Sequence, residues 1–428
     1  INSLSITINK DKLNDMFNNV EDDNFSEIIK ICRGITYKLE LGESDDRNKL
    51  VNWKNKYMNI LSEKYSSNLY SINFDVLKEI DNSKPIYSDD NELVDGRIII
   101  RDNFDKLLEK NNRIFIFGED VGMIGDVNQG LEGLQKKYGK NRVFDTGIRE
   151  STIVGQGIGM SMRGLRPIAE IQYLDYILYA LQILSDDLAT LTFRTHGGQK
   201  APLIVRTRGH RLEGIWHSGS PLGGILNFLR GIFVLTPRNM TKAAGFYNSL
   251  LDIDQPAVVI EPLNGYRTKE KLPINYGEFK TPLGEIEVLK EGNDITLVSY
   301  GSTVNIVNKV AKEIQNFNID CEVIDLQSLI PFDLSKNIYK SIIKTNRLMI
   351  IDEDVPGGGS SFILQELLNS QDIYEHLDSK PCLVTAKEHR PPYGSDGDYI
   401  SKPSFEDIFE EVYTVMNEAN PSKYKKLI

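Results

Sequence analysis

An acidic stretch at a strand–helix junction is the part of the sequence best placed to do chemistry. Asp145-Thr146-Gly147-Ile148-Arg149-Glu150-Ser151 follows a short strand expected at 142–146 and precedes a helix expected at 151–164. Open α/β sheets bind ligands at the carboxyl edge of their strands, and Glu150 falls at that edge. A glutamate there can also cap the helix or offset its dipole. The stretch alone leaves both interpretations open.

Two glycine-rich stretches invite a nucleotide-binding interpretation. Gly155, Gly157 and Gly159 are spaced G-x-G-x-G inside the expected helix. A dinucleotide fingerprint instead needs G-x-G-x-x-G at the turn that opens a helix, so we predict packing glycines. Gly357-Gly358-Gly359-Ser360-Ser361 follows a strand and opens a helix, where amides can hold an anion. A turn followed by a helix N-cap is the favoured interpretation.

The metal-binding patterns are weak. The five histidines lack H-x-x-x-H spacing and have no cysteine-rich surroundings, which argues against a zinc site. They are His196, His210, His217, His376 and His389. Asp396-Gly397-Asp398 lacks the further acids of a calcium loop, so we predict a turn there. We therefore assign no metal ligands to this chain.

The elements that must position these residues follow an alternating pattern. Short apolar runs alternate with helix-length segments, which predicts two doubly wound α/β domains over 91–272 and 284–428. A polar, mainly helical leader is expected over 1–90, and a proline-containing linker over 267–284. Expected strands are 113–118, 142–146, 167–171, 203–206, 233–236, 257–261, 294–299, 321–325, 347–351 and 382–385. Helices are expected at 49–61, 97–108, 151–164, 304–315 and 358–368.

Composition excludes several classes of protein. The 428 residues, 40% apolar and 26% charged, suit a globular chain of two or three domains. A net charge of −11 without a basic patch argues against nucleic acid as a partner. No apolar run approaches the ~20 residues of a membrane span, and no signal peptide is recognised. The three cysteines lie far apart, which fits a reducing cytoplasm.

Several blocks in a fixed order carry a resemblance to a known family. The chain resembles the beta subunit of the decarboxylating component of 2-oxo acid dehydrogenase complexes, a thiamine diphosphate enzyme of the transketolase superfamily. The resemblance runs from about Asn91 to Met416, and its 169–176 block looks closer to the branched-chain enzymes than to pyruvate dehydrogenases. The blocks are Gly118-Glu119-Asp120-Val121, 145–150, 165–172, Asp175-Tyr176, Trp216-His217-Ser218, 321–326 and Ile330-Pro331-Phe332-Asp333.

The resemblance implies roles for five residues. Glu150 matches the family glutamate that hydrogen-bonds a pyrimidine nitrogen of the cofactor and promotes formation of its reactive ylid. Ile148 and Tyr176 match positions that contact the same ring, although Tyr176 also fits an ordinary core tyrosine. Glu119 matches an acid beside the pocket. His217 matches the family's active-site histidine, a candidate proton donor during transfer to the lipoyl group.

The resemblance also implies an incomplete cofactor site. The superfamily holds the diphosphate and Mg²⁺ through a Gly-Asp-Gly motif followed by an asparagine, and Asp396-Gly397 is preceded by Ser395 instead. We therefore expect an alpha part to supply the metal, the diphosphate contacts and much of the substrate pocket. The leader and the tail around 394–403 resemble fused enzymes, in which alpha and beta parts share one polypeptide. We expect this chain to be the C-terminal part of such an enzyme.

The implied function is oxidative decarboxylation of a 2-oxo acid, branched-chain or pyruvate, with reductive acylation of a lipoyl group. The implied partners are the alpha part, a second beta part in an alpha2beta2-like assembly, and a lipoyl-bearing acyltransferase. Two alternatives stay open. One is a transketolase or deoxyxylulose phosphate synthase activity on the same fold, disfavoured by the missing metal motif. The other is a non-catalytic assembly subunit, disfavoured because Glu150, Tyr176 and His217 all occur in order.

Overall fold

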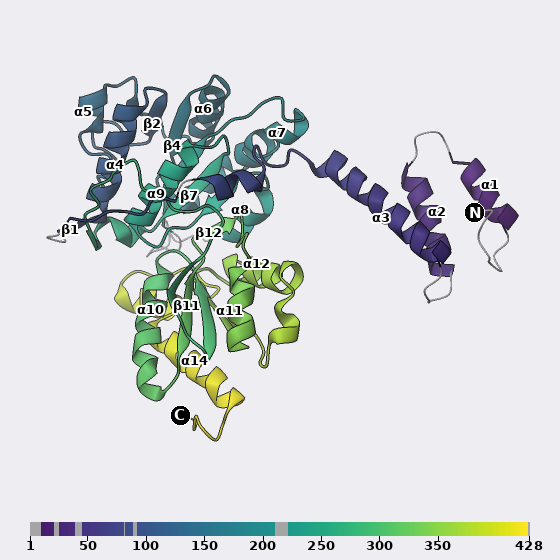
Figure 1. The fold of residues 1–428 in the computed structure, drawn as a ribbon. Helices are drawn as coiled ribbons and strands as arrows, with labels where there is room; N and C mark the ends of the chain where they lie inside the picture. The colour runs from purple at the N-terminus through teal and green to yellow at the C-terminus, as the bar shows by residue number, and fades with distance from the viewer. Residues whose placement is uncertain are drawn as a thin grey trace. The chain divides into compact units, whose positions relative to one another are not determined.

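The leader of the chain is helical, as predicted. A computed structural model describes residues 10–20, 25–38, 45–80, 82–88, 92–209 and 221–426. By internal contacts the chain divides into two units, Ile1–Ser67 and Asn68–Ile428. The described part of the first unit contains α1 (Lys10–Asn18), α2 (Phe25–Lys38) and α3 (Asp45–Ser66) (Figure 1). Ile29, Cys32 and Ile35 are buried along one stripe of α2, which gives that helix an apolar face.

The apolar runs of the first α/β domain form one largely parallel sheet. Within the described residues its strand order is β12-β6-β7-β5-β4-β2-β3, and only β12 runs antiparallel to its neighbour. Buried residues fill most of these strands, as expected when both faces of a parallel sheet are covered. The strands are β2 (Ile114–Gly118), β3 (Val143–Asp145), β4 (Arg166–Glu170), β5 (Ile204–Arg208), β6 (Phe233–Leu235), β7 (Ala257–Glu261) and β12 (Ser328–Ile330).

Helices connect these strands and pack on the sheet. Helix α4 buries Ile100, Phe104 and Leu108 at four-residue spacing. It packs against α9, where the Phe104 and Tyr247 rings lie with centroids 4.7 Å apart. The helical segments of this domain are η1 (Phe74–Glu79), α4 (Gly96–Lys110), α5 (Leu134–Tyr138), α6 (Glu150–Met162), η2 (Leu174–Ala180), η3 (Ile183–Leu188), α7 (Leu191–Arg194), α8 (Leu222–Phe228), α9 (Met240–Leu251) and η4 (Leu263–Tyr266).

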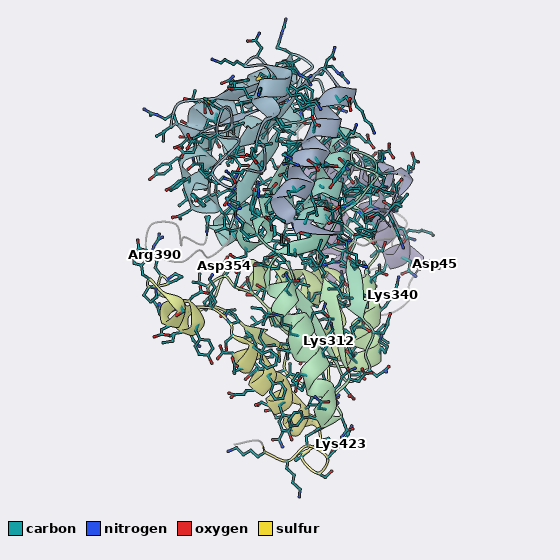
Figure 2. The ribbon with its side chains drawn as sticks, turned by 90° about the vertical axis from the view of Figure 1, so that its left-hand side faces the viewer. Asp45, Lys312, Lys340, Asp354, Arg390 and Lys423 are labelled. Carbon is teal, nitrogen blue, oxygen red and sulfur yellow. The ribbon has the colours of Figure 1, made fainter. Side chains whose placement is uncertain are left out.

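The second α/β domain has its own sheet, ordered β14-β13-β10-β11-β9 in the described residues. Only β9 is antiparallel. In Figure 2 this domain extends from Asp354 and Arg390, beside the first domain, to Lys423 at its far end. The strands are β9 (Glu287–Lys290), β10 (Ile295–Ser299), β11 (Cys321–Asp325), β13 (Leu348–Ile351) and β14 (Cys382–Val384). The helical segments are α10 (Thr303–Glu313), η5 (Ile314–Phe317), α11 (Asn337–Thr345), α12 (Gly359–Gln365), η6 (Glu366–Ser370), η7 (Ile373–His376), α13 (Ser395–Ser401) and α14 (Phe405–Ala419).

Two further pairings complete the second unit, and one of them joins its two domains. Strand β12 follows β11 in the chain but pairs with β6, so a segment of the second domain extends the first sheet. Strand β8 (Lys269–Lys271) pairs antiparallel with β1 (Leu93–Asp95). The stretch at 267–284 is therefore not a bare linker, because its first residues form a strand. No helix in the described part of the chain is long and apolar enough to cross a membrane.

Two sequence predictions about local structure are wrong. Asp396-Gly397-Asp398 forms the first turn of α13 rather than an isolated turn, and acids are favoured at that end of a helix. The packing prediction for the glycines of α6 holds for Gly157 alone. A Cβ on Gly157 would meet the Leu203 side chain at 2.6 Å, whereas a Cβ on Gly155 or Gly159 would meet nothing within 4 Å.

Candidate active site

Three loops leave the first sheet at one edge and carry the predicted site residues. Gly118 at the end of β2 pairs with Asp145 of β3 and with Glu170 of β4, so the three strands end level with one another. Glu119 follows β2 directly, Glu150 begins α6 after β3, and Tyr176 lies in η2 after β4. All three side chains are half-buried. The register of the sheet therefore brings residues from three separate sequence blocks to one edge.

The charges at this edge interact. Burial raises the pKa of Glu119, and the neighbouring carboxylates of Asp120 and Glu150 raise it further. Burial also raises the pKa of the Tyr176 hydroxyl, with contributions from Tyr173, Glu119, Asp175 and Glu150. Glu119 and Glu150 thus form an acidic pair beside a tyrosine. Within this pair the protonated form of Glu119 is favoured, because its carboxyl group is partly buried and is repelled by the neighbouring negative charges.

Aromatic and apolar side chains surround the acidic pair. The ring of Tyr176 meets Tyr173 edge to face at 5.8 Å and lies 6.4 Å from the ring of Tyr179. Ile148 is 75% exposed and Tyr179 is 71% exposed, so apolar surface is open at this edge. Met123, in the loop after β2, is 88% exposed. A flat heteroaromatic ring could be held here by apolar contact, with a carboxyl group aligned on one of its nitrogens.

Hydrogen bonds fix the three loops relative to one another. The backbone N–H of Gly122 donates to Oδ1 of Asp145 at 2.6 Å, which ties the loop after β2 to the end of β3. The amide Nε2 of Gln172 donates to Oδ2 of Asp120 at 3.1 Å, which ties the loop after β4 to the same segment. Asp120 has a φ of 58°, a left-handed conformation that such contacts help to maintain.

A fully buried network of charges lies below the loops. Arg206 of β5 contacts Asp126 at 3.0 Å and Glu261 at 3.0 Å, and it also contacts Glu170. Arg208 contacts Glu170 at 2.9 Å and donates to the backbone carbonyl of Gln172 at 2.9 Å. The hydroxyl of Tyr266 accepts from both arginines, and that of Tyr247 donates to Glu261 at 2.7 Å. The network thus joins β4, β5, β7, α9 and η4 to the loops that follow β2 and β4.

This network is a rigid support for the loops. Burial opposes ionisation of Asp126, but Arg206 and Arg208 outweigh it and hold the pKa of that carboxyl below its usual value. Complete burial raises the pKa of Glu170, although both arginines oppose the shift. Removing one partner of a buried ion pair costs about 3–5 kcal/mol. Arg208 therefore keeps Gln172, and through it Asp120, in place.

Comparisons with known proteins identify the family of the chain. Residues 93–269 match the transketolase pyrimidine-binding domain, and residues 284–400 match the transketolase C-terminal domain. The beta subunit of the pyruvate dehydrogenase E1 component of Acholeplasma laidlawii is 34% identical over 288 residues, which cover 67% of this chain and 87% of that relative. The chain belongs to the E1 beta-subunit family of 2-oxo acid dehydrogenases.

Other relatives of this E1 beta chain act in two substrate classes. The 2-oxoisovalerate dehydrogenase subunit beta of Pseudomonas aeruginosa is 32% identical over 322 residues, 71% of this chain and 90% of that relative. The pyruvate dehydrogenase E1 beta subunit of Bacillus subtilis is 29% identical over 311 residues, 72% of this chain and 94% of that relative. Among solved structures, a split-gene transketolase described as an inactive beta4 tetramer has a TM-score of 0.58 at 18% identity. The match covers 76% of this chain and 98% of the transketolase chain, and it shows a likeness in fold.

The predicted site residues of the E1 beta chain are only partly visible. The structure brings Glu119, Glu150 and Tyr176 together and leaves Ile148 exposed beside them. His217 lies in the segment 210–220, outside the described residues. Their roles toward a cofactor stay predictions. In the described part of the chain, no group of three or more His, Cys, Asp or Glu side chains is arranged to hold a metal ion.

Sequence reasoning missed the buried network, and a signal for it was available. Arg206 and Arg208 stand in a strand that is otherwise apolar apart from one threonine, and Glu170 ends another buried strand. Charged residues are almost never fully buried unless they are paired. Arginines at alternate positions of a buried strand therefore indicate acidic partners on neighbouring strands. The partner in the loop, Asp126, carries no comparable signal in the sequence.

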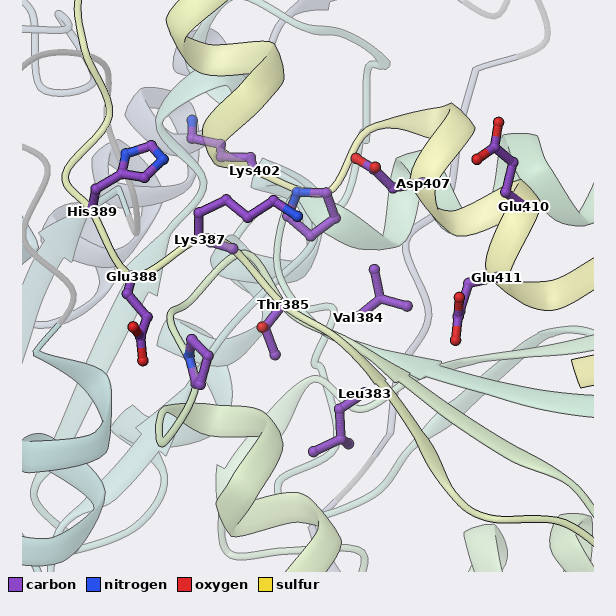
Figure 3. Close-up of a pocket in the computed structure, with 13 residues that line it drawn as sticks. Leu383, Val384, Thr385, Lys387, Glu388, His389, Lys402, Asp407, Glu410 and Glu411 are labelled. Atoms are coloured by element: carbon purple, nitrogen blue, oxygen red, sulfur yellow. The ribbon is translucent and has the colours of Figure 1, made fainter. Parts of the chain in front are cut away.

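A cavity lies away from the site edge, at the carboxyl edge of the second sheet. It has a volume of about 830 Å³ and is lined by Lys387 and Lys402 on one side and by Asp407, Glu410 and Glu411 of α14 on the other (Figure 3). Several of these groups are engaged internally. Lys402 pairs with Asp398 at 2.8 Å, and Glu411 accepts from the thiol of Cys382 at 3.1 Å. None of the predicted site residues lines this cavity.

Proposed function

We propose that this E1 beta chain carries the pyrimidine half of a thiamine diphosphate site and is active only with an alpha part. The observation that carries the proposal is the meeting of Glu150, Glu119 and Tyr176 at the open edge of a transketolase pyrimidine-binding domain. These residues fit the aminopyrimidine ring, because a carboxyl group, an aromatic ring and the apolar Ile148 lie at one edge. When bound, the cofactor supplies the nucleophilic carbon that adds to a 2-oxo acid.

Each residue of the chain has a defined task in this proposal. Glu150 would be the carboxyl group that exchanges a proton with a ring nitrogen of the bound cofactor. Glu119, whose own pKa is raised by burial and by the nearby carboxylates, would be an acid beside it. Tyr176 and Ile148 would contact the ring. His217 donates a proton when the acyl group passes to a lipoyl group.

The partners follow from the same arrangement. The site edge exposes Met123, Ile148 and Tyr179, a set of large apolar side chains that an alpha part would cover. That part would also supply the Mg²⁺ and the diphosphate contacts. The split-gene transketolase of similar fold offers a parallel, since its beta4 tetramer is described as inactive. A pair of beta parts, a lipoyl-bearing acyltransferase as acyl acceptor and a cytoplasmic location complete the proposal.

Reconstitution tests this function. The 428-residue chain is mixed with an alpha polypeptide that carries a Gly-Asp-Gly motif, and CO₂ release from pyruvate and from 3-methyl-2-oxobutanoate is measured with an artificial electron acceptor. We expect release only when both polypeptides, thiamine diphosphate and Mg²⁺ are present. Calorimetry on the chain alone should show weak binding of thiamine diphosphate. Tight, magnesium-dependent binding by the isolated chain would contradict the half-site.

A further inference from the structure

A second cavity, of about 470 Å³, lies where the two α/β domains meet. The segment 82–87 forms one wall, and the start of α9 forms another. The residues that lead into β9, together with Gln327 just before β12, close it from the second domain. A cavity of this size lies within the range of small-molecule sites, about 300–1,000 Å³. It is separate from the site edge that carries Glu150.

The walls of this cavity are held by specific contacts. The backbone N–H of Lys280 donates to the carbonyl of Ser83 at 2.8 Å. The N–H of Ile86 donates to Oδ1 of Asn275 at 2.8 Å, and Tyr87 bridges to Pro273. The segment 82–87 is thus fastened to the chain that follows β8. The cavity therefore exists before any ligand enters it.

Basic side chains outnumber acidic ones in the lining of the cavity, although the whole chain has a net charge of −11. Lys84, Arg238, Lys242 and Lys280 line it, and Glu287 is the one carboxylate among the lining residues that the structure describes. Lys242 pairs with Glu287 at 2.7 Å, and Lys280 pairs with Asp252 at 2.6 Å. Lys84 takes part in no ion pair within the described residues.

Arg238 keeps donors available for a ligand. Its contacts with Glu287 and with Asp325, at 2.6 Å, both use Nη1. A guanidinium has five N–H donors in a fixed fork, so Nε and Nη2 can address a second group. The N–H groups at the start of α9 are already engaged, since Met240 and Thr241 donate to Glu270. The side chains, rather than the helix end, provide the positive field.

The lining also includes apolar side chains, uncharged polar residues and one acceptor without a hydrogen-bond partner in the described part of the chain. Phe279, Pro282 and Ile286 provide apolar surface. Gln327 is 1% exposed, and its Nε2 donates to the carbonyl of Glu285 at 3.0 Å. Its Oε1 has no hydrogen-bond partner in the described part of the chain. A buried acceptor without a partner is costly, and a ligand N–H or O–H would satisfy it.

We propose that this cavity binds a phosphate-bearing small molecule with a flat ring, the chemistry of a nucleoside phosphate. The phosphate lies against Arg238 and Lys84, since a guanidinium fork and a lysine ammonium both recognise phosphate oxygens. The ring lies against the apolar lining and donates to Oε1 of Gln327. Because the ligand touches both domains, its binding also couples their positions.

Calorimetry on the 428-residue chain tests the proposal with ADP, inorganic phosphate and adenosine as probes. We expect ADP to bind at one site, with an affinity that falls as salt is added, because the contacts are ionic. Adenosine should bind at least about tenfold more weakly than ADP, since a charge-assisted contact is equivalent to about that factor. Equal affinities for adenosine and ADP, or no heat with ADP, overturn the proposal.

Variants locate the binding. Lys84→Gln should weaken ADP binding by about tenfold, and Lys280→Gln should weaken it by a smaller factor, since Lys280 is already paired with Asp252. Lys309→Gln, at an exposed position on α10, is the matched control and should leave the affinity unchanged. Lys84 has no ion pair to lose, so its variant should fold normally, which melting curves check. Normal affinity for ADP in both pocket variants places ADP elsewhere and overturns the proposal.

Discussion

Gln172 and Asp120 join two loops of the active-site edge through a hydrogen bond of 3.1 Å from Nε2 to Oδ2. Asp120 lies in the loop after β2, outside any helix or strand, and has a φ of 58°. Its position therefore depends on such contacts. Arg208 holds Gln172 from the other side through its backbone carbonyl. Contacts therefore connect the buried network, through Gln172, to Asp120, which is next to Glu119 in the sequence. Gln172 is therefore a positioning residue for the acidic pair.

Gln172→Met should lower the decarboxylation kcat of the reconstituted enzyme by about tenfold, because a hydrogen bond to a charged group is lost. The KM for the 2-oxo acid should stay near that of the unmodified enzyme, since Gln172 acts through the position of the loop that carries Glu119. Steady-state kinetics check both results. Gln315→Met, exposed in η5, is the control. A lower melting temperature with an unchanged kcat would mean that Gln172 has only a structural part.

Glu150→Gln should abolish decarboxylation while leaving the fold intact. In the proposed role the carboxyl group passes a proton to the cofactor ring, which an amide cannot do, and loss of such catalysis costs about 10²–10⁴-fold. Decarboxylation rates with the alpha part present check the loss of activity. Melting curves of the chain check that the fold is intact. Glu406→Gln, at an exposed acid in the first turn of α14, tests the effect of an acid-to-amide change at a helix start. Turnover near the unmodified level in Glu150→Gln would remove the assigned role.

The sequence predicted the long elements because their apolar pattern is strong. The strands predicted at 113–118 and 294–299 correspond to β2 and β10, which are nearly fully or fully buried, and a buried parallel strand leaves that signature. Strand β8 has the sequence Lys-Glu-Lys, with no apolar residue, and was absorbed into a linker. Strand β12 is short and pairs across domains, a relation that local pattern does not contain.

The candidate site was predictable only to the extent that motifs fix positions along the chain. Glu119 and Tyr176 were assigned through the family resemblance, and Glu150 was assigned both through it and through its place between a predicted strand and a predicted helix. Their mutual approach depends on the order β4-β2-β3, which the sequence does not reveal. The buried contacts of Arg206 depend on that order as well, since its partners come from three separate segments.

The glycines of α6 allow a direct test of packing against helix propensity. Gly157→Ala should destabilise the chain by about 1–3 kcal/mol, because its Cβ would meet Leu203 at 2.6 Å and the core must shift. Gly155→Ala and Gly159→Ala should stabilise it by up to about 1 kcal/mol each, since their Cβ atoms meet nothing within 4 Å. Denaturant unfolding of the isolated chain measures all three. Equal effects at the three positions would contradict the assigned packing.

The joint between the domains should make stability depend on pH through Asp325. Complete burial raises the pKa of this carboxyl from 3.8 to about 6, although Arg238 favours its ionised form. In the unfolded chain the group loses its proton near pH 4, whereas in the folded chain it keeps the proton until about pH 6. The folded state then binds more protons, so the contribution of Asp325 to stability falls as pH rises through this window.

The comparison with Asp325→Asn isolates this effect, because asparagine has the same shape and does not titrate. The difference in unfolding free energy, unmodified chain minus variant, should fall by on the order of 3 kcal/mol between about pH 4 and pH 6 and stay constant above that. The nearby Glu287 acts in the opposite direction. Burial raises its pKa, but Arg238 and Lys242 prevail and lower it, and its contribution is lost as pH falls. Subtracting the variant cancels that part, so a difference that rises with pH would show that the ion pair with Arg238 outweighs the burial of Asp325.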